Sequence, residues 1–197
     1  MNLRVERLTG DRLHTAIPAL ARLRMTVFRD WPYLYDGTLS YEQSYLAKFG
    51  EADGAVVVAA YDGNEMVGAA TASPMAGHAD DFSKPFRARG FDVSEIFYYG
   101  ESVLLKSHRG HGVGHAFFDQ REAHARSIGG FKHLAFCSVV RPDDHPLRPG
   151  DYRPLDGFWR KRGFEKVDGM MATFSWKDVD QDAETAKPMQ FWMKALA

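Results

Sequence analysis

The feature that most constrains the fold lies in the middle of the chain, where a strand, a glycine-rich turn, a long helix and a second strand follow one another. Residues 96–105 (IFYYGESVLL) are aromatic and β-branched and predict a central strand. Apolar residues recur at helical spacing over residues 112–128, Gly129-Gly130 ends that helix, and residues 133–140 predict a second buried strand. This order predicts one parallel, right-handed crossover.

Predicted hairpins flank this crossover on both sides. Residues 55–61 and 65–73 are separated by Asp-Gly-Asn, and residues 164–167 and 170–176 by Asp-Gly, the strongest short hairpin signal in the chain. Hairpin strands pair antiparallel, whereas the crossover strands pair parallel. The sheet is therefore expected to be mixed.

Two outer strands and several helices complete the predicted pattern. Residues 3–8 and 189–196 predict the first and last strands, and helical spacing or capping signals predict helices over residues 13–28, 40–49, 83–90 and 155–162. Pro18 is compatible with the first helix only in its first turn, and Ser40 is the expected cap of the second. We expect an α/β (α+β) fold with a mixed, mostly antiparallel central sheet of six to seven strands flanked by helices, in a single domain spanning residues 1–197.

The composition excludes several classes of protein. Lys and Arg number 25 against 26 Asp and Glu, so a net charge of −1 leaves no basic field for a nucleic acid. The longest apolar run, residues 55–61, is far shorter than the roughly 20 residues that span a bilayer. The first ten residues lack the apolar stretch of a signal peptide, and Cys137 is the only cysteine. We expect a cytoplasmic protein without a nucleic acid or membrane partner.

The turn between the central strand and the long helix reads Arg-Gly-His-Gly-Val-Gly over residues 109–114. Glycines let backbone N–H groups approach a phosphate, and the helix that follows adds a positive dipole end. The dinucleotide pattern GxGxxG fails because His115 stands where it needs glycine, and no Gly-Lys-Ser/Thr follows as in a phosphate loop. The glycines could instead only make a tight turn, and the wrong spacing disfavours a nucleotide-binding oxidoreductase.

Arg-x-x-Gly-x-Gly after a strand, at the start of a long helix, resembles the acetyl-CoA motif of the GNAT superfamily of N-acetyltransferases. The order of predicted elements is similar over nearly the whole chain, including a short helix that ends in Gly163-Phe164. The resemblance implies that acetyl-CoA is the co-substrate, that N–H groups over residues 109–114 hold its pyrophosphate, and that strand backbone lies along its pantetheine arm. His115 could add a phosphate contact or face solvent. The implied cofactor-binding residues are Val103, Leu104, Leu105, Arg109, Gly110, His111, Gly112, Val113, Gly114 and His115.

Glu101 is the candidate general base. Acetyl transfer needs a neutral amine, yet an alkylamine with a pKa near 10 is mostly ammonium at pH 7, so the site must accept a proton. Members of the family often place a carboxylate at this position of the motif strand. Strand alternation puts Glu101 on the face of Tyr99 and Val103, opposite Tyr98 and Ser102. An acidic residue in an apolar strand could also serve as a structural ion pair or a hydrogen-bond hub.

The acid that protonates the leaving thiolate is harder to identify. The family usually carries a tyrosine four residues before Gly163, where this chain has Trp159, and an asparagine seven residues earlier, where it has Tyr152. Indole cannot donate a proton to a thiolate at neutral pH. Tyr152 is the best substitute, although it could only pack its loop, and the thiolate could also leave unprotonated or take a proton from water.

Cys137 and the histidines near the turn could support other chemistry. Cys137 could carry an acetyl group in a two-step reaction, but a buried structural cysteine is commoner. His108, His111 and His115 have spacing suited to a metal, but no acidic ligand lies between them and the glycines favour turn chemistry. We expect no metal site.

The acceptor is expected to bind near the first two helices. The resemblance places this segment over the acceptor pocket, and aromatic rings beside carboxylates suit a cationic amine, although any one ring could simply pack the helices on the sheet. Trp31, Tyr33 and Tyr35 are the candidate substrate-binding residues. Residues 141–153 are expected to form the other rim of the pocket. Its arginine side chains could hold an acidic acceptor or the 3′-phosphate of coenzyme A, or they could only be solvated. They are Arg141, Arg148 and Arg153.

These features favour an acetyl-CoA-dependent N-acetyltransferase that acts on a primary amine by direct transfer in a ternary complex. The near-neutral net charge of the chain favours a small-molecule amine. A longer acyl donor or a protein acceptor is an alternative within enzymes. The alternative outside enzymes is a non-catalytic acyl-CoA-binding sensor or partner module, which the missing family tyrosine supports. Met189, Phe191, Trp192 and Met193 make the last strand more apolar than an exposed edge should be, a weak indication of a homodimer.

Overall fold

A computed structural model describes residues 2–78 and 80–196 and contains a seven-stranded sheet with the strand order β1-β2-β3-β4-β5-β7-β6. Only the neighbours β4 and β5 pair parallel, and every other neighbouring pair is antiparallel. The strands are β1 Leu3–Leu8, β2 Val56–Asp62, β3 Glu65–Pro74, β4 Ile96–Leu104, β5 His133–Val139, β6 Glu165–Lys177 and β7 Glu184–Ala195. The mixed, mostly antiparallel sheet with one parallel crossover is confirmed.

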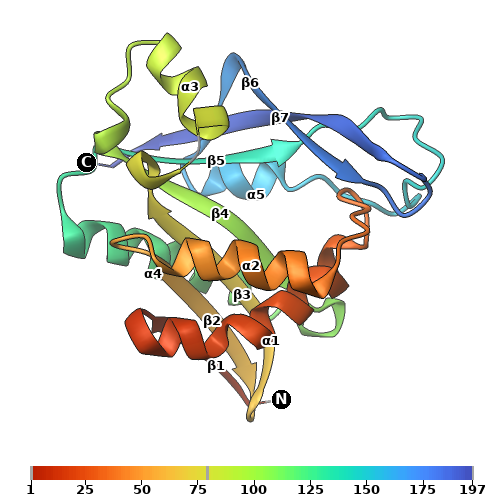
Figure 1. Ribbon diagram of the computed structural model, residues 1–197, viewed down its shortest axis with the longest axis horizontal. Coiled ribbons are helices and arrows are strands. Elements are labelled where there is room, and N and C mark those ends of the chain that lie inside the picture. The colour runs from red at the N-terminus through yellow and green to blue at the C-terminus, as the bar shows by residue number, and fades with distance from the viewer. Residues whose placement is uncertain (1, 79, 197) are drawn as a thin grey trace.

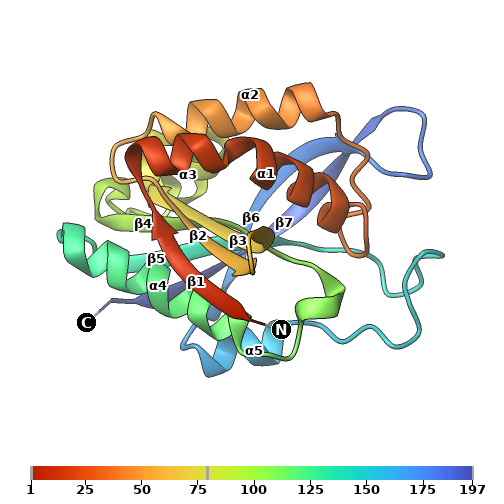
Figure 2. The ribbon, with the colours of Figure 1, turned by 90° about the horizontal axis from the view of Figure 1, so that it is seen from below.

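Helices cover both faces of the sheet (Figures 1 and 2). Figure 2 shows α1 and α2 above the sheet and α4 and α5 below it, with α4 as the crossover between β4 and β5. The helices are α1 Gly10–Phe28, α2 Leu39–Gly50, α3 Asp80–Ala88, α4 Val113–Ile128 and α5 Asp156–Lys161. No helix of the described residues is both long and apolar enough to cross a membrane.

Strand β2 shows why both faces must be covered. Val56 and Val58 pack in the core on the α4 side, whereas Val57 and Ala59 pack against α1 and α2, and all four are fully buried. Side chains of a strand alternate between its two faces, so a continuous apolar run is stable only between two helical layers.

Two details of the predicted helices are wrong. Pro18 lies in the middle of α1, which begins at Gly10. Leu13 and Leu20 on either side of it are buried against the sheet, and this packing outweighs the backbone hydrogen bond that proline cannot make. Thr38, rather than Ser40, caps α2, because its hydroxyl accepts a hydrogen bond from the Tyr41 N–H.

The predicted hairpin at Asp168-Gly169 is also wrong. Strand β6 runs through both residues, and its pairing with β7 shifts register between Lys166 and Met171. Gly169 has a positive φ of 61°, so it supplies the backbone conformation of a bulge rather than that of a two-residue turn. The Asp168 carbonyl accepts a hydrogen bond from Arg89. An Asp-Gly pair has the same backbone freedom in either setting, which is why the sequence could not separate them.

The apolar character of the last strand is accounted for within one chain. Strand β7 lies between β5 and β6, so it is not an edge of the sheet. Phe191 and Trp192 are fully buried, and Met189 nearly so. The expectation of a homodimer therefore loses the sequence observation on which it rested.

Candidate active site

Strands β4 and β5 separate soon after they begin. They pair only from Ile96 opposite His133 to Tyr98 opposite Ala135, after which β4 continues along β3 and β5 along β7. Figure 1 shows β4 running diagonally away from β5 beyond this point. The backbone of β4 that faces β5 is thus left without strand partners, and such N–H and C=O groups require another hydrogen-bonding partner.

A bulge in β4 lies where the strands separate. Ala72 opposes Tyr99 and Ala70 opposes Ser102, so β4 has one more residue than β3 over this interval. The Glu101 N–H donates to Thr71 Oγ1 at 3.2 Å. A Cβ on Gly100 would lie 2.4 Å from that oxygen, so a larger residue there would displace the Thr71 hydroxyl from the Glu101 N–H. The bulge changes which residues share a face.

The predicted alternation around Glu101 is therefore half wrong. Tyr99 packs in the core on the α4 side, whereas Val103 packs against α1 and α2. The Glu101 carboxylate lies on the α1 side with Val103, where it contacts Arg24, so it does not share a face with Tyr99. A bulge shifts the side-chain alternation by one residue, and no sequence signal distinguishes it from regular strand here.

Arg121 of α4 holds the bulge from the opposite face. Its guanidinium donates to the carbonyls of Thr71 and Glu101, each at 3.3 Å, and to Ser102 Oγ at 3.0 Å, and it lies 4.1 Å from the centre of the Tyr99 ring. The side chain is 1% exposed, and no carboxylate pairs with it among the described residues. Burial lowers the pKa of Arg121 to about 10, so it remains charged at neutral pH.

The Glu101 carboxylate takes part in a buried charge cluster. Its Oε1 lies 2.7 Å from Arg24 Nη1, and Arg24 Nε donates to Glu42. Glu101 is 9% exposed and Glu42 0%. The Tyr35 hydroxyl donates to Glu42 Oε1 at 2.8 Å. Burial alone would lower the pKa of Arg24, but the negative groups around it, Glu101 above all, more than offset this and raise the pKa above its ordinary value. We call Arg24, Glu42 and Glu101 the acceptor cluster.

This cluster confirms the ion-pair alternative for Glu101 without excluding a role as base. The contact between Arg24 and Glu101 has ion-pair distance, yet Glu101 Oε1 has no hydrogen-bond partner among the described residues. Glu42 shares the Arg24 cation, so the cluster holds two carboxylates and one cation. Arg121, which is charged and donates to the Glu101 carbonyl, brings a second cation to Glu101 from the other face of the sheet.

Tyr98 and Cys137 line the same face where the two strands part. The Tyr98 hydroxyl lies 3.0 Å from Cys137 Sγ. Burial raises the pKa of Cys137 to about 12, so the thiol, which is 9% exposed, stays protonated. Since only the thiolate is nucleophilic, Cys137 is a structural residue and the two-step alternative is not supported.

The loop after α1 brings aromatic side chains to this face. The Trp31 ring lies 5.9 Å from that of Tyr152 and 5.1 Å from that of His145. The Tyr33 ring stacks on Trp176. Burial, and then the charges of Cys137 and Glu101, raise the pKa of the Tyr33 hydroxyl, so it stays protonated.

The three predicted substrate-binding residues thus differ in what they contact. Trp31 contacts the Tyr152 ring, and Tyr33 lies near enough to Tyr152 to feel its charge. Tyr35 instead donates its hydroxyl to the buried Glu42, which makes it a support of the acceptor cluster. Burial also raises the pKa of Tyr152, whose hydroxyl remains a proton donor at neutral pH.

The expectation for Arg141 is wrong. Arg141 forms a two-pronged ion pair with Asp178, at 2.6 and 2.9 Å, and donates to the carbonyls of Pro32 and Tyr33. It is therefore neither solvated nor available to an acidic acceptor or a 3′-phosphate, and it fixes the loop that carries Trp31 and Tyr33. Arg148 pairs with Asp143.

The glycine turn has the backbone that an anion site needs. Gly110 and Gly112 have φ values of 83° and 81°, which favour glycine, and a Cβ at either would meet nothing within 4 Å. Within the described part of the chain, the N–H groups of residues 110–115 donate to no protein acceptor. Helix α4 begins at Val113, so its positive dipole end lies in the same place.

Side chains around the turn stabilise its shape. His111 Nδ1 lies 2.9 Å from the Arg109 carbonyl, and Arg109 donates to the Leu104 carbonyl. Val113 is buried, so only its backbone faces the turn. The exposed His115 ring packs against Phe158, and the two ring centres lie 5.0 Å apart.

Comparisons with known proteins identify the family of this chain and its fold. The profile of the acetyltransferase (GNAT) family matches residues 19–150, more than half of the chain. The chain belongs to the GNAT acetyltransferase family. No curated protein matches it at a significant level.

Solved GNAT structures share the whole fold at low sequence identity. N-acetyltransferase from Staphylococcus aureus Mu50 has a TM-score of 0.63 at 11% identity, over 100% of both chains. Ribosomal-protein-alanine N-acetyltransferase from Brucella melitensis has a TM-score of 0.61 at 16% identity, over 98% of this chain and 99% of that one. An aminoglycoside 6′-N-acetyltransferase complexed with coenzyme A has a TM-score of 0.59 at 16% identity, over 98% and 97%. These similarities show the fold.

In this GNAT fold, fewer of the three predicted residues of the motif strand direct their backbone groups toward a ligand than the sequence suggests. The Leu105 N–H donates to the Val67 carbonyl, so it belongs to the pairing with β3. The N–H and C=O groups of successive residues point to opposite edges of a strand. Those of Val103 therefore point toward β3 as well, and those of Leu104 point toward the gap. We therefore expect Leu104, of the three predicted residues, to meet the pantetheine amides.

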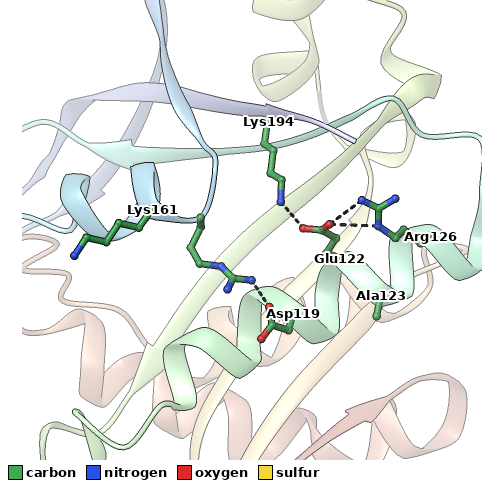
Figure 3. Close-up of a pocket in the computed structure, with 7 residues that line it drawn as sticks. Asp119, Glu122, Ala123, Arg126, Lys161 and Lys194 are labelled. Carbon is green, nitrogen blue, oxygen red and sulfur yellow. Dashed lines mark hydrogen bonds and ion pairs between the residues drawn. The ribbon is translucent and has the colours of Figure 1, made fainter. Parts of the chain in front are cut away.

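Two hollows lie near these elements. One of about 350 Å³ separates the end of α1 from the start of the turn, and it is lined by Thr26, Val27, Asp30, Leu105, Lys106, Ser107 and Arg109. The other, of about 430 Å³, lies between α4, α5 and β7 (Figure 3). In it, Glu122 pairs with Lys194 and Arg126, Asp119 pairs with Arg162, and Lys161 points away. The charges of the second hollow are thus largely paired with one another.

Sequence reasoning missed Arg24, Glu42 and Arg121. Each carried a signal, because each stands four residues from a buried apolar residue of its own helix: Leu20, Leu46 and Phe117 respectively. A charged residue at an apolar-face position must be paired or hydrogen-bonded once the helix packs. Their partners, however, lie far away in the sequence.

Proposed function

We propose that this GNAT acetyltransferase transfers the acetyl group of acetyl-CoA to the primary amine of a small molecule, by direct transfer in a ternary complex. The observation that carries the proposal is the position of Glu101. Its carboxylate lies at the bulge where β4 parts from β5, a few residues before a turn with free N–H groups. An acid–base group and an anion cradle on one strand suit a thioester donor that carries a pyrophosphate.

The residues of the turn fit coenzyme A. Free N–H groups over residues 110–115 would hold the pyrophosphate, and the open space over Gly110 and Gly112 lets it approach the backbone. Leu104 would hydrogen-bond a pantetheine amide along the unpaired edge of β4. Bound acetyl-CoA supplies the activated acetyl group, and the chain supplies its position and the proton transfers.

Glu101 and Tyr152 would perform the two proton transfers. An acceptor amine is mostly ammonium at neutral pH, and Glu101, directly or through a water, would take its proton before attack. Tyr152 would protonate the leaving thiolate, because its raised pKa keeps the hydroxyl protonated. Trp159, at the family's usual tyrosine position, packs between Phe136 and Trp192 and takes no part.

The test is acetyl-CoA turnover against a panel of amines, amino acids and peptides. Glu101→Gln should abolish most turnover and leave acetyl-CoA binding intact, and Tyr152→Phe should lower kcat with little change in the KM of acetyl-CoA. Glu122→Gln, a carboxylate on the far face of the molecule, is the matched control and should leave both unchanged. Turnover with any amine rejects the non-catalytic alternative.

Donor binding is tested separately by thermal shift. A ligand at about 100 times its Kd adds roughly 2.7 kcal/mol to the free energy of unfolding, which for this size is a rise of about 5–10 °C in Tm. A rise with acetyl-CoA and none with NAD or ATP supports the proposal. A rise with NAD alone contradicts it.

A further inference from the structure

The Tyr33 ring lies where two apolar clusters of the chain meet. One cluster is formed by α1, α2 and the strands beneath them and includes Val103 of β4. The other includes Tyr98 of β4 and Cys137 of β5, and the Tyr33 ring packs against both. Along β4 the two clusters meet at the bulge, because Glu101 lies between Tyr98 and Val103. Tyr33 therefore covers the place where β4 separates from β5.

The position of Tyr33 is fixed by contacts on several sides. Its carbonyl accepts hydrogen bonds from Arg141 Nη2 at 2.6 Å and from Trp176 Nε1 at 2.9 Å. Its ring centre lies 4.6 Å from that of Phe28, and the ring also stacks on Trp176 at 6.0 Å. Arg141 is itself held by its ion pair with Asp178. A side chain held in this way can present a polar group in one direction without reorganising.

The Tyr33 hydroxyl has no protein partner among the described residues, and its oxygen is not fully enclosed. Two neighbouring tyrosines differ in this respect. Tyr35 donates its hydroxyl to Glu42, and the Tyr98 hydroxyl is bonded to Cys137. Burial raises the pKa of the Tyr33 hydroxyl above its usual value, so it keeps its proton at neutral pH. It is thus a fixed, neutral donor that the fold itself does not use.

The proposed function brings the reacting carbonyl to this hydroxyl. The pyrophosphate would be held at residues 110–115, and the pantetheine arm would pass Leu104 on its way toward the separation of the strands. Leu104 and Glu101 are three residues apart, about 10 Å along a strand. Because Glu101 deprotonates the amine that attacks, the thioester must come to the bulge, which Tyr33 covers.

We infer that Tyr33 is a further catalytic residue, whose hydroxyl donates a hydrogen bond to the thioester carbonyl oxygen and stabilises the negative charge that develops there. The inference rests on the proposed function and adds a residue to its chemistry. A donor placed in advance where charge develops is among the largest contributions to catalysis.

Tyr33 keeps its proton throughout the transfer. The ammonium group loses one proton to Glu101 before attack. The neutral amine then forms the C–N bond, the electron pair of the C=O bond moves onto oxygen, and it returns as the C–S bond breaks with its pair on sulfur. The nitrogen loses a second proton and the sulfur gains one through Tyr152, so the products are an amide and a thiol.

The first experiment removes the hydroxyl alone. In Tyr33→Phe, with saturating acetyl-CoA and an amine that the wild-type chain acetylates, kcat should fall by about 10²–10³-fold, the usual loss when one such donor is removed. The Kd of acetyl-CoA and the midpoint of urea unfolding should stay unchanged, because the ring and backbone contacts remain. Tyr61→Phe is the matched control. Tyr61 is also partly buried against the α1 and α2 cluster, has no protein partner for its hydroxyl among the described residues, and should show normal kinetics.

The second experiment needs no turnover. A hydrogen bond to a carbonyl oxygen lowers the C=O stretching frequency, and infrared difference spectra of acetyl-CoA with and without ¹³C at the carbonyl isolate this band in the complex. We expect the bound thioester to absorb at a lower frequency in the wild-type chain and in Tyr61→Phe than in Tyr33→Phe. A purely structural role of Tyr33 would leave the band where it is.

The outcomes separate the inference from the proposed function. Normal kcat in Tyr33→Phe, or an unchanged carbonyl frequency, overturns the inference and leaves the proposed function standing. A higher KM for the amine with unchanged kcat also overturns it, because Tyr33 would then contact the acceptor instead. A large fall in the urea midpoint would show that the hydroxyl supports the fold, which contradicts the inference. Absence of turnover by the wild-type chain with every amine overturns the proposed function and the catalytic role with it, whereas the carbonyl frequency still decides the contact.

Discussion

The donor and acceptor sides of the site lie next to each other on β4 but are built from different parts of the chain. The glycine turn uses backbone N–H groups of consecutive residues, 110–115. The acceptor cluster uses side chains of Arg24, Glu42 and Glu101, which come from three elements. In the proposed function, the backbone cradle would hold a phosphate whatever the acceptor is, whereas the side-chain cluster would contact the acceptor. Substitutions on the two sides should therefore change different kinetic constants.

The largest expected effect is on the acceptor side. Glu101→Gln keeps the size of the side chain and removes the proton acceptor, so kcat should fall by about 10²–10⁴-fold, the usual contribution of general base catalysis. The KM and Kd of acetyl-CoA should change little. Steady-state kinetics and isothermal titration with acetyl-CoA measure the two. A large loss of acetyl-CoA affinity would mean that Glu101 belongs to both sides and would break the comparison.

The second effect tests the support beneath Glu101. Arg121→Leu removes the buried donor to the carbonyls of Thr71 and Glu101 and should destabilise the chain by at least about 3 kcal/mol, because each unsatisfied buried acceptor costs about 1–3 kcal/mol. Urea unfolding measures this. In the folded variant, kcat should fall while the KM of acetyl-CoA holds.

Arg121→Lys separates support of the bulge from general stability. Lysine keeps the charge and part of the hydrogen bonding. Relative to Arg121→Leu, Arg121→Lys should therefore restore a larger share of the lost kcat than of the lost free energy of unfolding. Thr71→Val, which removes the acceptor of the Glu101 N–H, offers a milder test of the same bulge. Normal kcat in both variants would show that the bulge keeps its shape without these contacts.

The same difference explains what the sequence could predict. The turn over residues 109–114 and the crossover around it are contiguous, so local patterns of glycine and apolar spacing reveal them. The acceptor cluster depends on which faces of α1 and α2 meet β4, and that is set by packing over the whole sheet. Arg24 could be recognised as misplaced on an apolar face, but its two partners could not be named.

The errors within the sheet have a related physical origin. The bulges at Glu101 and at Gly169 both add residues to one strand of a pair, and no amino-acid pattern in the sequence marks either bulge. In the first, alternation predicted the wrong neighbours for Glu101, and in the second an Asp-Gly pair predicted a hairpin. A bulge is stabilised by contacts from other elements, here Arg121 on one and Arg89 on the other.

The third effect concerns the donor side and has a matched control. Gly112→Ala places a Cβ on a residue with φ of 81°, which costs about 1–2 kcal/mol of strain, and pushes it toward the bound pyrophosphate. Because the added Cβ would crowd the pyrophosphate, we expect the KM of acetyl-CoA to rise about tenfold, the equivalent of about 1.4 kcal/mol of lost binding free energy, with the preference among acceptors unchanged. Gly90 has a φ of 79° and equally open surroundings, so Gly90→Ala should lose similar stability with normal kinetics. Similar kinetics for both variants would contradict a role for the turn.

The smallest expected effect is on the pH dependence of stability and concerns His78, which lies behind the acceptor side. Burial lowers the pKa of His78 to about 4, and its Nε2 lies 2.8 Å from Ser73 Oγ. The folded pKa is below the value of about 6.5 in the unfolded chain, so as the pH falls the unfolded state takes up the proton first. Stability contributed by neutral His78 is present above about pH 6.5 and is lost down to about pH 4. His78→Gln should flatten this part of the urea-midpoint profile, whereas His14→Gln, at an exposed position, should not. A profile unchanged by His78→Gln would show that the imidazole is hydrated in the folded chain, and with it that water reaches the acceptor side from behind Tyr98.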